Sequence, residues 1–251
     1  MREPELKSGE MIEGLQYKGL RIIQNDAGFR FGTDSVLLAA FVHASAKDRI
    51  VDLGTGTGVI AILLNGRTGA KLTGVEIQPE QCNMARRSVD MNAQDIPVIE
   101  ADMRTVHGIL GRGAFDIAVC NPPYYSKTAG KLSQKGEGEY EGAATHDLYC
   151  TMDEVAKSAD NLLKFGGKFV FCCPASRLAE AFAALNARRL EPKRLRLVAS
   201  MEGKPPYLAL IEAKKGAAPG LIIEKQLTVC NSDGSYTEEV NAIYHRESAD
   251  E

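Results

Sequence analysis

Residues 49–58 read RIVDLGTGTG, an apolar strand of five residues that runs directly into three glycines at alternate positions. An apolar helical segment, residues 59–64, follows at once. A glycine turn between a strand and a helix lets the backbone approach a ligand, and the helix N-terminus favours polar or anionic groups. Val59 stands where a dinucleotide-binding GxGxxG turn has its third glycine, which disfavours NAD. The stretch therefore predicts a cofactor site at the start of an α/β fold.

Outward from this turn, short apolar runs alternate with helical patterns, which is typical of a parallel sheet covered on both faces. Thr151 and Glu154 form a capping box for a later helix, which we expect to stop at Gly166 and Gly167. The fold class is α/β, doubly wound around a mostly parallel sheet. Strands are expected at residues 49–53, 71–76, 97–100, 115–120, 168–173, 194–198 and 207–213, and helices at 59–64, 79–92, 152–163 and 178–185.

The length of 251 residues suits one α/β domain with small appendages. We expect an N-terminal extension with a short hairpin at 1–32, using strand-like residues 20–23 and 29–31. The main domain is expected at 33–215 and a C-terminal tail at 216–251, whose purpose the sequence leaves open.

Composition narrows the function classes. A net charge of -3 argues against a globally basic nucleic-acid binder. No apolar run approaches the roughly 18 residues of a membrane span, and no secretory region opens the chain, so a cytoplasmic location is expected. The six cysteines lack paired CxxC spacing and lie mostly in apolar stretches, which favours buried thiols over a disulfide or metal site.

The second informative motif is Asn121-Pro122-Pro123-Tyr124, which closes the apolar strand 115–120. Asn121 and a proline carbonyl can accept the hydrogens of a planar amino group, and Tyr124 can stack on a flat substrate. Holding the acceptor in line with a methyl donor makes the reaction effectively unimolecular. The motif therefore predicts methyl transfer to an exocyclic or amide nitrogen.

Two carboxylates complete the predicted cofactor site. Glu76 ends the strand about 20 residues after the glycine turn, where a carboxylate can bind ribose hydroxyls. Asp102 follows the third strand and can accept from an adenine amino group. No Walker lysine follows a glycine loop, so an adenosine without phosphates, S-adenosyl-L-methionine, fits better than ATP.

On these residues the chain resembles the class I S-adenosylmethionine-dependent methyltransferases that modify amino nitrogens, over residues 31–213. The resemblance implies a Rossmann-like, seven-stranded sheet with one antiparallel strand. Residues 31–38 (FGTDSVLL), 190–194 (LEPKR) and 234–237 (GSYT) more specifically resemble the tRNA (adenine-N6)-methyltransferase family, which acts on the adenine 3′ of the anticodon in valine tRNA. In that family the segment around Thr33 and Asp34 closes over the methionine end of the cofactor.

The expected site residues follow from the motifs and this resemblance. The expected cofactor contacts are Phe31, Thr33, Asp34, Asp52, Gly54, Gly56, Gly58, Glu76, Ile77, Asp102, Met103 and Asn121. The expected catalytic residues are Asn121, Pro122, Pro123 and Tyr124. This chain has Thr145-His146-Asp147 where the family has Arg-His-Glu.

The partner implied by the resemblance is tRNA. The basic residues that could contact its phosphates are Lys127, Arg188, Arg189, Lys193, Arg194 and Arg196. A charge cluster can equally be a solvated face, and the alternation of Arg194 and Arg196 with leucines also suits a half-exposed strand.

Three alternatives stay open from the sequence. The motif alone does not separate adenine from guanine, so guanine-N2 methylation of ribosomal RNA is one. The same motif can present a glutamine amide, as in release-factor glutamine-N5 methylation, although the segment before Phe31 is short for the helical substrate domain those enzymes carry. A cofactor-binding module that holds RNA without turnover is the non-enzyme alternative.

Overall fold

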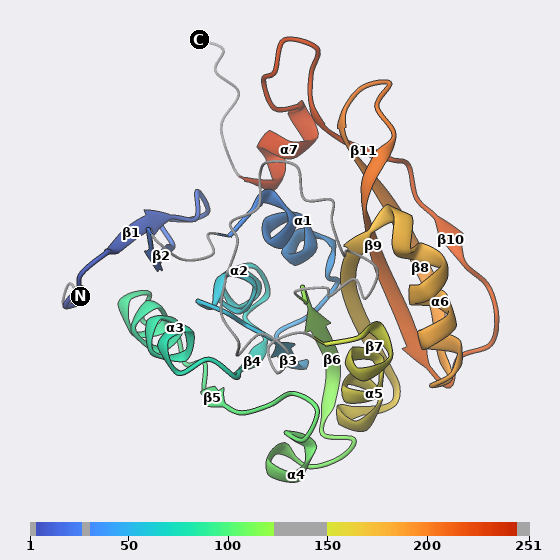
Figure 1. Cartoon of the computed structure of the whole chain (residues 1–251), viewed down its shortest axis with the longest axis horizontal. Helices are drawn as coiled ribbons and strands as arrows, with labels where there is room; N and C mark the ends of the chain where they lie inside the picture. Colours follow the sequence, from blue (N-terminus) through green and yellow to red (C-terminus); the bar gives the residue numbers. More distant parts are fainter. Residues whose placement is uncertain (1–3, 27–30, 123–149, 245–251) are drawn as a thin grey trace, which may run out of the picture.

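The computed structural model describes residues 4–26, 31–122 and 150–244. Within them one twisted sheet of nine strands forms the centre of the molecule, in the order β10-β8-β9-β7-β6-β3-β4-β5, with β11 also pairing with β8 (Figure 1). The strands are β3 (Arg49–Leu53), β4 (Lys71–Glu76), β5 (Val98–Glu100), β6 (Phe115–Cys120), β7 (Leu163–Pro174), β8 (Leu190–Met201), β9 (Pro206–Lys215), β10 (Ile222–Ile223) and β11 (Leu227–Cys230).

Helices cover both faces of this sheet, as the alternation predicts. The helices are α1 (Thr33–Phe41), α2 (Val59–Thr68), α3 (Pro79–Met91), α4 (His107–Leu110), α5 (Met152–Leu162), α6 (Leu178–Asn186) and α7 (Glu238–Ile243). Buried residues of α1, α2 and α3 contribute to one large core cluster, while those of α5 and α6 belong to a second. Neighbouring strand residues point to opposite faces. Cys172 accordingly lies in the first cluster and Cys173 in the second.

The doubly wound fold class is confirmed. β3, β4, β5, β6 and β7 run parallel, and β9 runs antiparallel to both β7 and β8. The strands β8 and β9 are longer than expected. The helix stop at Gly166 and Gly167 was wrong, because α5 ends at Leu162 and both glycines belong to β7.

An N-terminal hairpin precedes the sheet, formed by β1 (Glu10–Gly14) and β2 (Arg21–Asn25). Its first strand is upstream of the expected pair, and Phe31 is in no strand. The hairpin packs on α3, where the Ile23 N–H donates to Ser88 Oγ at 2.9 Å and Arg87 pairs with Glu10. It therefore covers the helix that follows β4.

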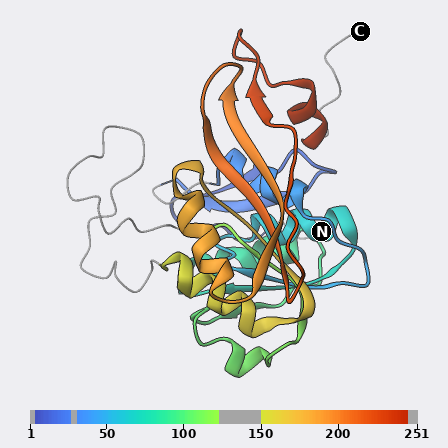
Figure 2. The ribbon, with the colours of Figure 1, turned by 90° about the vertical axis from the view of Figure 1, so that its right-hand side faces the viewer.

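The C-terminal segment extends the sheet. β10 and β11 both run parallel to β8, and β11 rises beside the long β8–β9 hairpin (Figure 2). Leu227, Val229, Val240 and Tyr244 belong to the same core cluster as α1. Among the described residues, no helix combines the length and apolar character that crossing a membrane requires.

Candidate active site

The predicted site residues meet where the strand order reverses. β3 lies between β4 and β6: from β3 the chain runs outward through β4 and β5, then returns to the other side of β3 with β6 and β7. Leu53 and Cys120 are register partners at the carboxyl ends of β3 and β6. The glycine turn and Asn121 therefore leave from adjacent strand ends. A crevice at the carboxyl edge of such a switch point is the ligand site that this topology favours.

The glycine turn is held in a conformation that requires glycine. Gly54, Gly56 and Gly58 have φ values of 71°, 56° and 97°, a region that residues with a Cβ rarely adopt. The N–H groups of Gly54 and Thr55 both donate to the Val75 carbonyl at 2.9 Å. The turn is thereby tied to the end of β4.

Asp52 lies beneath the turn, with no exposed surface. Its Oδ2 accepts from the Thr55 hydroxyl at 2.7 Å, while Oδ1 has no hydrogen-bond partner among the described residues. Burial raises the pKa of this carboxyl from 3.8 to about 7. Asp52 therefore braces the turn and keeps one acceptor oxygen unused.

Glu76 connects the turn to the end of β4. Its Oε2 accepts from the Gly56 N–H and its Oε1 from the Gln78 N–H, both at 2.9 Å. Burial raises the pKa of this carboxyl. A carboxylate has about four acceptor positions. Its two oxygens can therefore accept further bonds from ligand hydroxyls while they hold Gly56.

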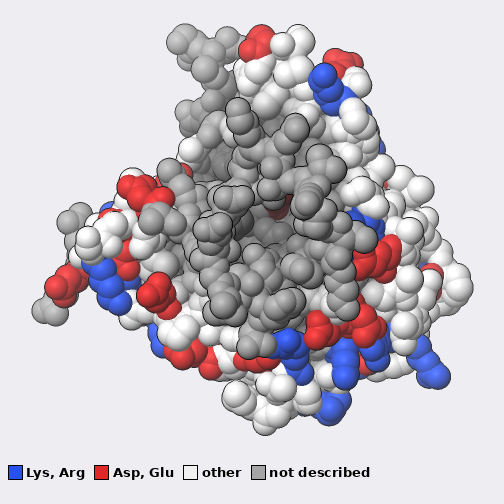
Figure 3. All heavy atoms as spheres, viewed as in Figure 1, with Lys and Arg blue, Asp and Glu red and all other residues white. Residues whose placement is uncertain are grey.

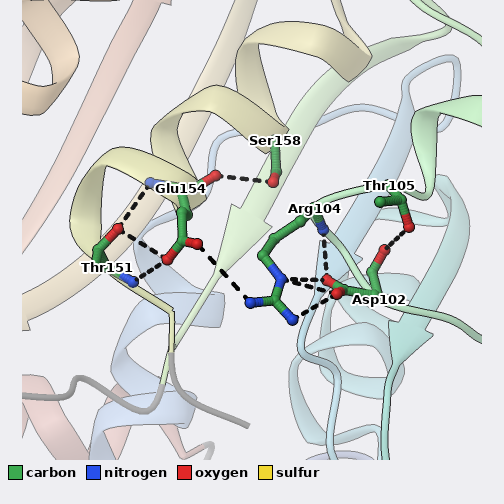
Figure 4. Close-up of polar contacts among 6 residues, drawn as sticks. All are labelled: Asp102, Arg104, Thr105, Thr151, Glu154 and Ser158. Atoms are coloured by element: carbon green, nitrogen blue, oxygen red, sulfur yellow. Dashed lines mark hydrogen bonds and ion pairs between the residues drawn. The ribbon is translucent and has the colours of Figure 1, made fainter. Parts of the chain in front are cut away.

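Asp102 is already bound by a neighbour. The Arg104 guanidinium donates through Nε to Oδ1 at 3.0 Å and to Oδ2 at 2.8 Å, and also lies 3.8 Å from Glu154 at the start of α5 (Figure 4). Although burial alone would raise it, these bonds hold the pKa of the Asp102 carboxyl below its usual value. Arg104 thus connects the end of β5 with the capping box of α5.

The first turn of α1 approaches the same edge. The Phe31 N–H donates to Gln24 of the hairpin at 2.9 Å, which fixes the entry to the helix. The Tyr207 hydroxyl of β9 donates to Asp34 Oδ1 at 3.0 Å, and burial raises the pKa of both groups. Thr33 is half-buried.

Asn121 lies at the end of β6, half-buried between two other segments. Its Nδ2 donates to Ser35 Oγ of α1 at 3.1 Å, and the Cys172 thiol of β7 donates to its Oδ1 at 3.0 Å. Pro122 is buried. Pro123, Tyr124, Lys127 and the segment Thr145-His146-Asp147 lie outside the described residues, so their predicted roles stay predictions.

These contacts fit the cofactor inferred from the sequence. The three positive-φ glycines place no side chain at positions 54, 56 and 58 of the turn, and an unpartnered buried oxygen of Asp52 lies beneath it. Ile77 and Met103 are half-buried after β4 and β5, and the Met103 methyl lies 3.3 Å from where a Cβ on Gly54 would be. Glu76 keeps free acceptor positions beside the turn, which a contact with ribose hydroxyls requires. No cluster of metal ligands occurs among the described residues.

The predicted phosphate contacts are mostly engaged within the protein. The Arg194 side chain is 14% exposed and forms ion pairs with Glu212 and Glu224, so it is a structural residue of the sheet. Arg196 pairs with Glu239, Arg188 with Asp153, and Lys193 donates to the Ala218 carbonyl. Arg189 is exposed. Acidic and basic side chains intermix around the visible rim of the carboxyl-edge face (Figure 3).

Sequence reasoning missed several residues of the site. Ser35 and Tyr207 contact predicted residues that are 86 and 173 positions away. Cys172 reads as apolar strand, and only its contact with Asn121 shows another role. Arg104 had a local signal, because its own N–H and guanidinium both reach Asp102 two residues earlier.

Comparisons with known proteins agree with this geometry. Residues 27–135 match the family described as Methyltransferase small domain. A Bacteroides fragilis protein is 28% identical over 198 residues, covering 78% of this chain and 81% of that protein. A Phocaeicola vulgatus protein is 28% identical over 228 residues, covering 90% of this chain and 94% of that protein. Both relatives are named tRNA1(Val) (adenine(37)-N6)-methyltransferase.

Solved structures show the same architecture. A predicted O-methyltransferase from Agrobacterium tumefaciens superposes with a TM-score of 0.68 at 23% identity, covering 86% of this chain and 98% of its own. M. jannaschii TYW2, in complex with AdoMet, superposes with a TM-score of 0.58 at 15% identity. The match covers 84% of this chain and 88% of that protein. At these identities the likeness concerns the fold. The match to this family over residues 27–135 spans both the glycine turn and Asn121, the fold is that of the class I methyltransferases, and the chain is an S-adenosyl-L-methionine-dependent methyltransferase.

Proposed function

We propose that this methyltransferase modifies N6 of an adenine in tRNA, namely the adenine 3′ of the anticodon in valine tRNA. The observation that carries the proposal is the placement of Asn121 beside the glycine turn, because both directly follow Leu53 and Cys120, which are register partners on adjacent strands. The substrate is suggested by the names of the relatives, which are 25–29% identical to this chain. A tRNA loop suits the site because its bases unstack at low cost.

The proposed mechanism uses oriented acceptors rather than a strong base. The adenine amino group donates its hydrogens to Asn121 Oδ1 and the Pro122 carbonyl, and the ring stacks on Tyr124. As positive charge builds on the amino nitrogen, these oriented dipoles stabilise the transition state. Bound S-adenosyl-L-methionine supplies the electrophilic methyl group. Asp34, Asp52, Glu76 and Asp102 are the acidic residues proposed to hold it.

The substrate is tested by methyl transfer from labelled S-adenosyl-L-methionine to unmodified valine tRNA, to ribosomal RNA and to a release factor, followed by nucleoside and amino-acid analysis. We expect label only as N6-methyladenosine in the tRNA. The matched control is the same tRNA with guanosine replacing the adenosine at position 37, the position in the relatives' names, which should take up no label. Label in guanosine of ribosomal RNA, or in protein glutamine, would replace the proposed substrate. Tight cofactor binding without label in any acceptor would favour the RNA-binding alternative.

Two substitutions separate the proposed roles of the residues. Asn121→Ala should lower turnover at least about 100-fold with little change in cofactor affinity, because it removes a transition-state acceptor. Glu76→Ala should weaken cofactor binding, because it removes both the ribose acceptor and the partner of Gly56. Calorimetric titration with S-adenosylhomocysteine provides the affinity. Equal losses of affinity in both variants would contradict this division of roles.

A further inference from the structure

The Asn121 side chain is held from two sides by Ser35 and Cys172, neither of which is among the expected catalytic residues or cofactor contacts. Ser35, in the first turn of α1, accepts from Nδ2 at 3.1 Å. Cys172, in β7, donates its thiol proton to Oδ1 at 3.0 Å. Ser35 is 7% exposed and Cys172 is fully buried. The amide is therefore fixed by a helix and a strand that flank β6, and both contacts are protected from water.

Counting donors and acceptors shows what these contacts leave available. A carboxamide has two N–H donors and two oxygen lone pairs. Ser35 uses one donor and Cys172 uses one lone pair, so Oδ1 keeps a second lone pair. An amide without such contacts can turn by about 180° and present N–H groups where an acceptor is needed. An amino substrate would then meet donors instead of an acceptor.

Cys172 favours the orientation of the Asn121 amide in which Oδ1, and not Nδ2, faces β7. Sulfur is a weak acceptor, so an N–H group in that position would be poorly satisfied. Burial raises the pKa of the Cys172 thiol well above its usual value, which keeps the donor protonated at neutral pH. The thiol therefore acts as a permanent donor to Oδ1.

The serine side of the contact is equally fixed. The neighbouring Asp34 accepts from the Tyr207 hydroxyl of β9 at 3.0 Å, and the Ser35 N–H donates to the Gly32 carbonyl at 3.2 Å. The first turn of α1 is thus anchored to the sheet next to the residue that binds Asn121. Consecutive residues of this turn serve the predicted cofactor site and the acceptor site.

We propose that Ser35 and Cys172 are positioning residues for methyl transfer, which fix the Asn121 amide so that Oδ1 presents its remaining lone pair to the substrate nitrogen. The inference rests on the proposed role of Asn121 as a hydrogen acceptor. It applies to any amino or amide nitrogen and does not depend on adenine being the substrate.

The adjacent cysteine provides a matched control. Cys173 is as buried as Cys172 but belongs to the opposite core cluster. Cys172→Ala and Cys173→Ala therefore remove the same atoms from the same strand, and only the first removes a contact with Asn121. Cys172→Ala should lower kcat about tenfold, with the KM for S-adenosyl-L-methionine unchanged. Cys173→Ala should keep kcat within about threefold, and Cys172→Ser, which keeps a donor, should recover most of the loss.

The methyl acceptor in these assays is whichever substrate the labelling experiment identifies. The test therefore remains valid if adenine is not the substrate. Ser35→Ala should resemble Cys172→Ala, and the double variant should approach the turnover of Asn121→Ala. Equal kcat values for Cys172→Ala and Cys173→Ala would overturn the proposal. A fall in cofactor affinity that matches the fall in kcat would also overturn it.

A second measurement needs no substrate. The side-chain amide of Asn121 can be assigned by NMR from the signal that disappears in Asn121→Ala. In the wild type and in Cys173→Ala, the proton bonded to Ser35 should exchange slowly with water. Exchange should become at least about tenfold faster in Ser35→Ala and in Cys172→Ala. Unchanged exchange in Ser35→Ala would show that the amide is not held by these residues.

Discussion

Asp52 is a buried carboxyl group whose protonation in the folded protein changes near neutral pH. Burial raises its pKa to about 7, while the unfolded chain has a value of about 3.9. Between these values the folded state holds a proton that the unfolded state releases. The stabilisation from this group is therefore complete below about pH 4 and is lost as the pH rises through about 7.

The predicted loss of stability with rising pH can be measured with Asp52→Asn, whose side-chain oxygen can still accept the hydrogen bond from Thr55. The stability of the wild type minus that of the variant should fall by up to about 4 kcal/mol between pH 4 and 8, measured by urea unfolding without cofactor. Glu10→Gln is the control. The Arg87 hydrogen bond lowers the pKa of Glu10, so its contribution is lost only as the pH falls, and its difference should stay constant above about pH 5. A constant difference for Asp52→Asn would contradict the prediction.

At the scale of elements, the capping box of Thr151 and Glu154 stabilises the N-terminus of α5. Thr151 Oγ1 accepts from the Glu154 N–H at 3.2 Å, and Glu154 Oε2 accepts from the Thr151 N–H at 2.8 Å. Thr151→Ala should lower the free energy of unfolding by about 0.5–2 kcal/mol, because it leaves a helix N–H without its partner. Thr151→Ser keeps the hydroxyl and should stay close to the wild type. Urea unfolding of the three proteins checks this, and a Ser variant as unstable as the Ala variant would exclude the cap as the cause.

Elements with a strong local signal could be predicted from the sequence. For the capping box, the proline that opens α3 and the glycine turn, a few neighbouring residues are enough to predict the local structure. β10 and β11 have only two and four residues, too few for a sequence pattern to place them in the sheet, so only their pairing with β8 does so. The site divides in the same way. Glu76 ends one strand and Asn121 follows another, so both can be located from the sequence, whereas Ser35 and Cys172 acquire their roles only when distant segments meet.

At the scale of the molecule, Tyr17 of the N-terminal hairpin and Ile243 of α7 both contact the end of α2. The Arg67 guanidinium at the end of α2 lies over the Tyr17 ring at 4.4 Å and donates to the Ile243 carbonyl of α7 at 2.6 Å. The Tyr236 and Tyr244 rings stack on each other, with 5.7 Å between their centroids. The C-terminal segment is therefore part of the same packed structure as α1 and α2.

This packing predicts that the segment stabilises the whole fold. Leu227 of β11 is 1% exposed in the α1 core cluster, whereas Ile223 of β10 is 69% exposed. Leu227→Ala should lower the free energy of unfolding by about 2–5 kcal/mol, because it removes buried atoms and leaves a cavity. Ile223→Ala changes an exposed side chain four residues away and should stay within about 0.5 kcal/mol. Urea unfolding followed by circular dichroism measures both variants. A separate, earlier transition in Leu227→Ala, with the main transition unmoved, would mean that β11 and α7 unfold independently of the sheet. A single transition displaced to lower urea is expected, because Leu227 packs into the cluster that also contains α1 and α2.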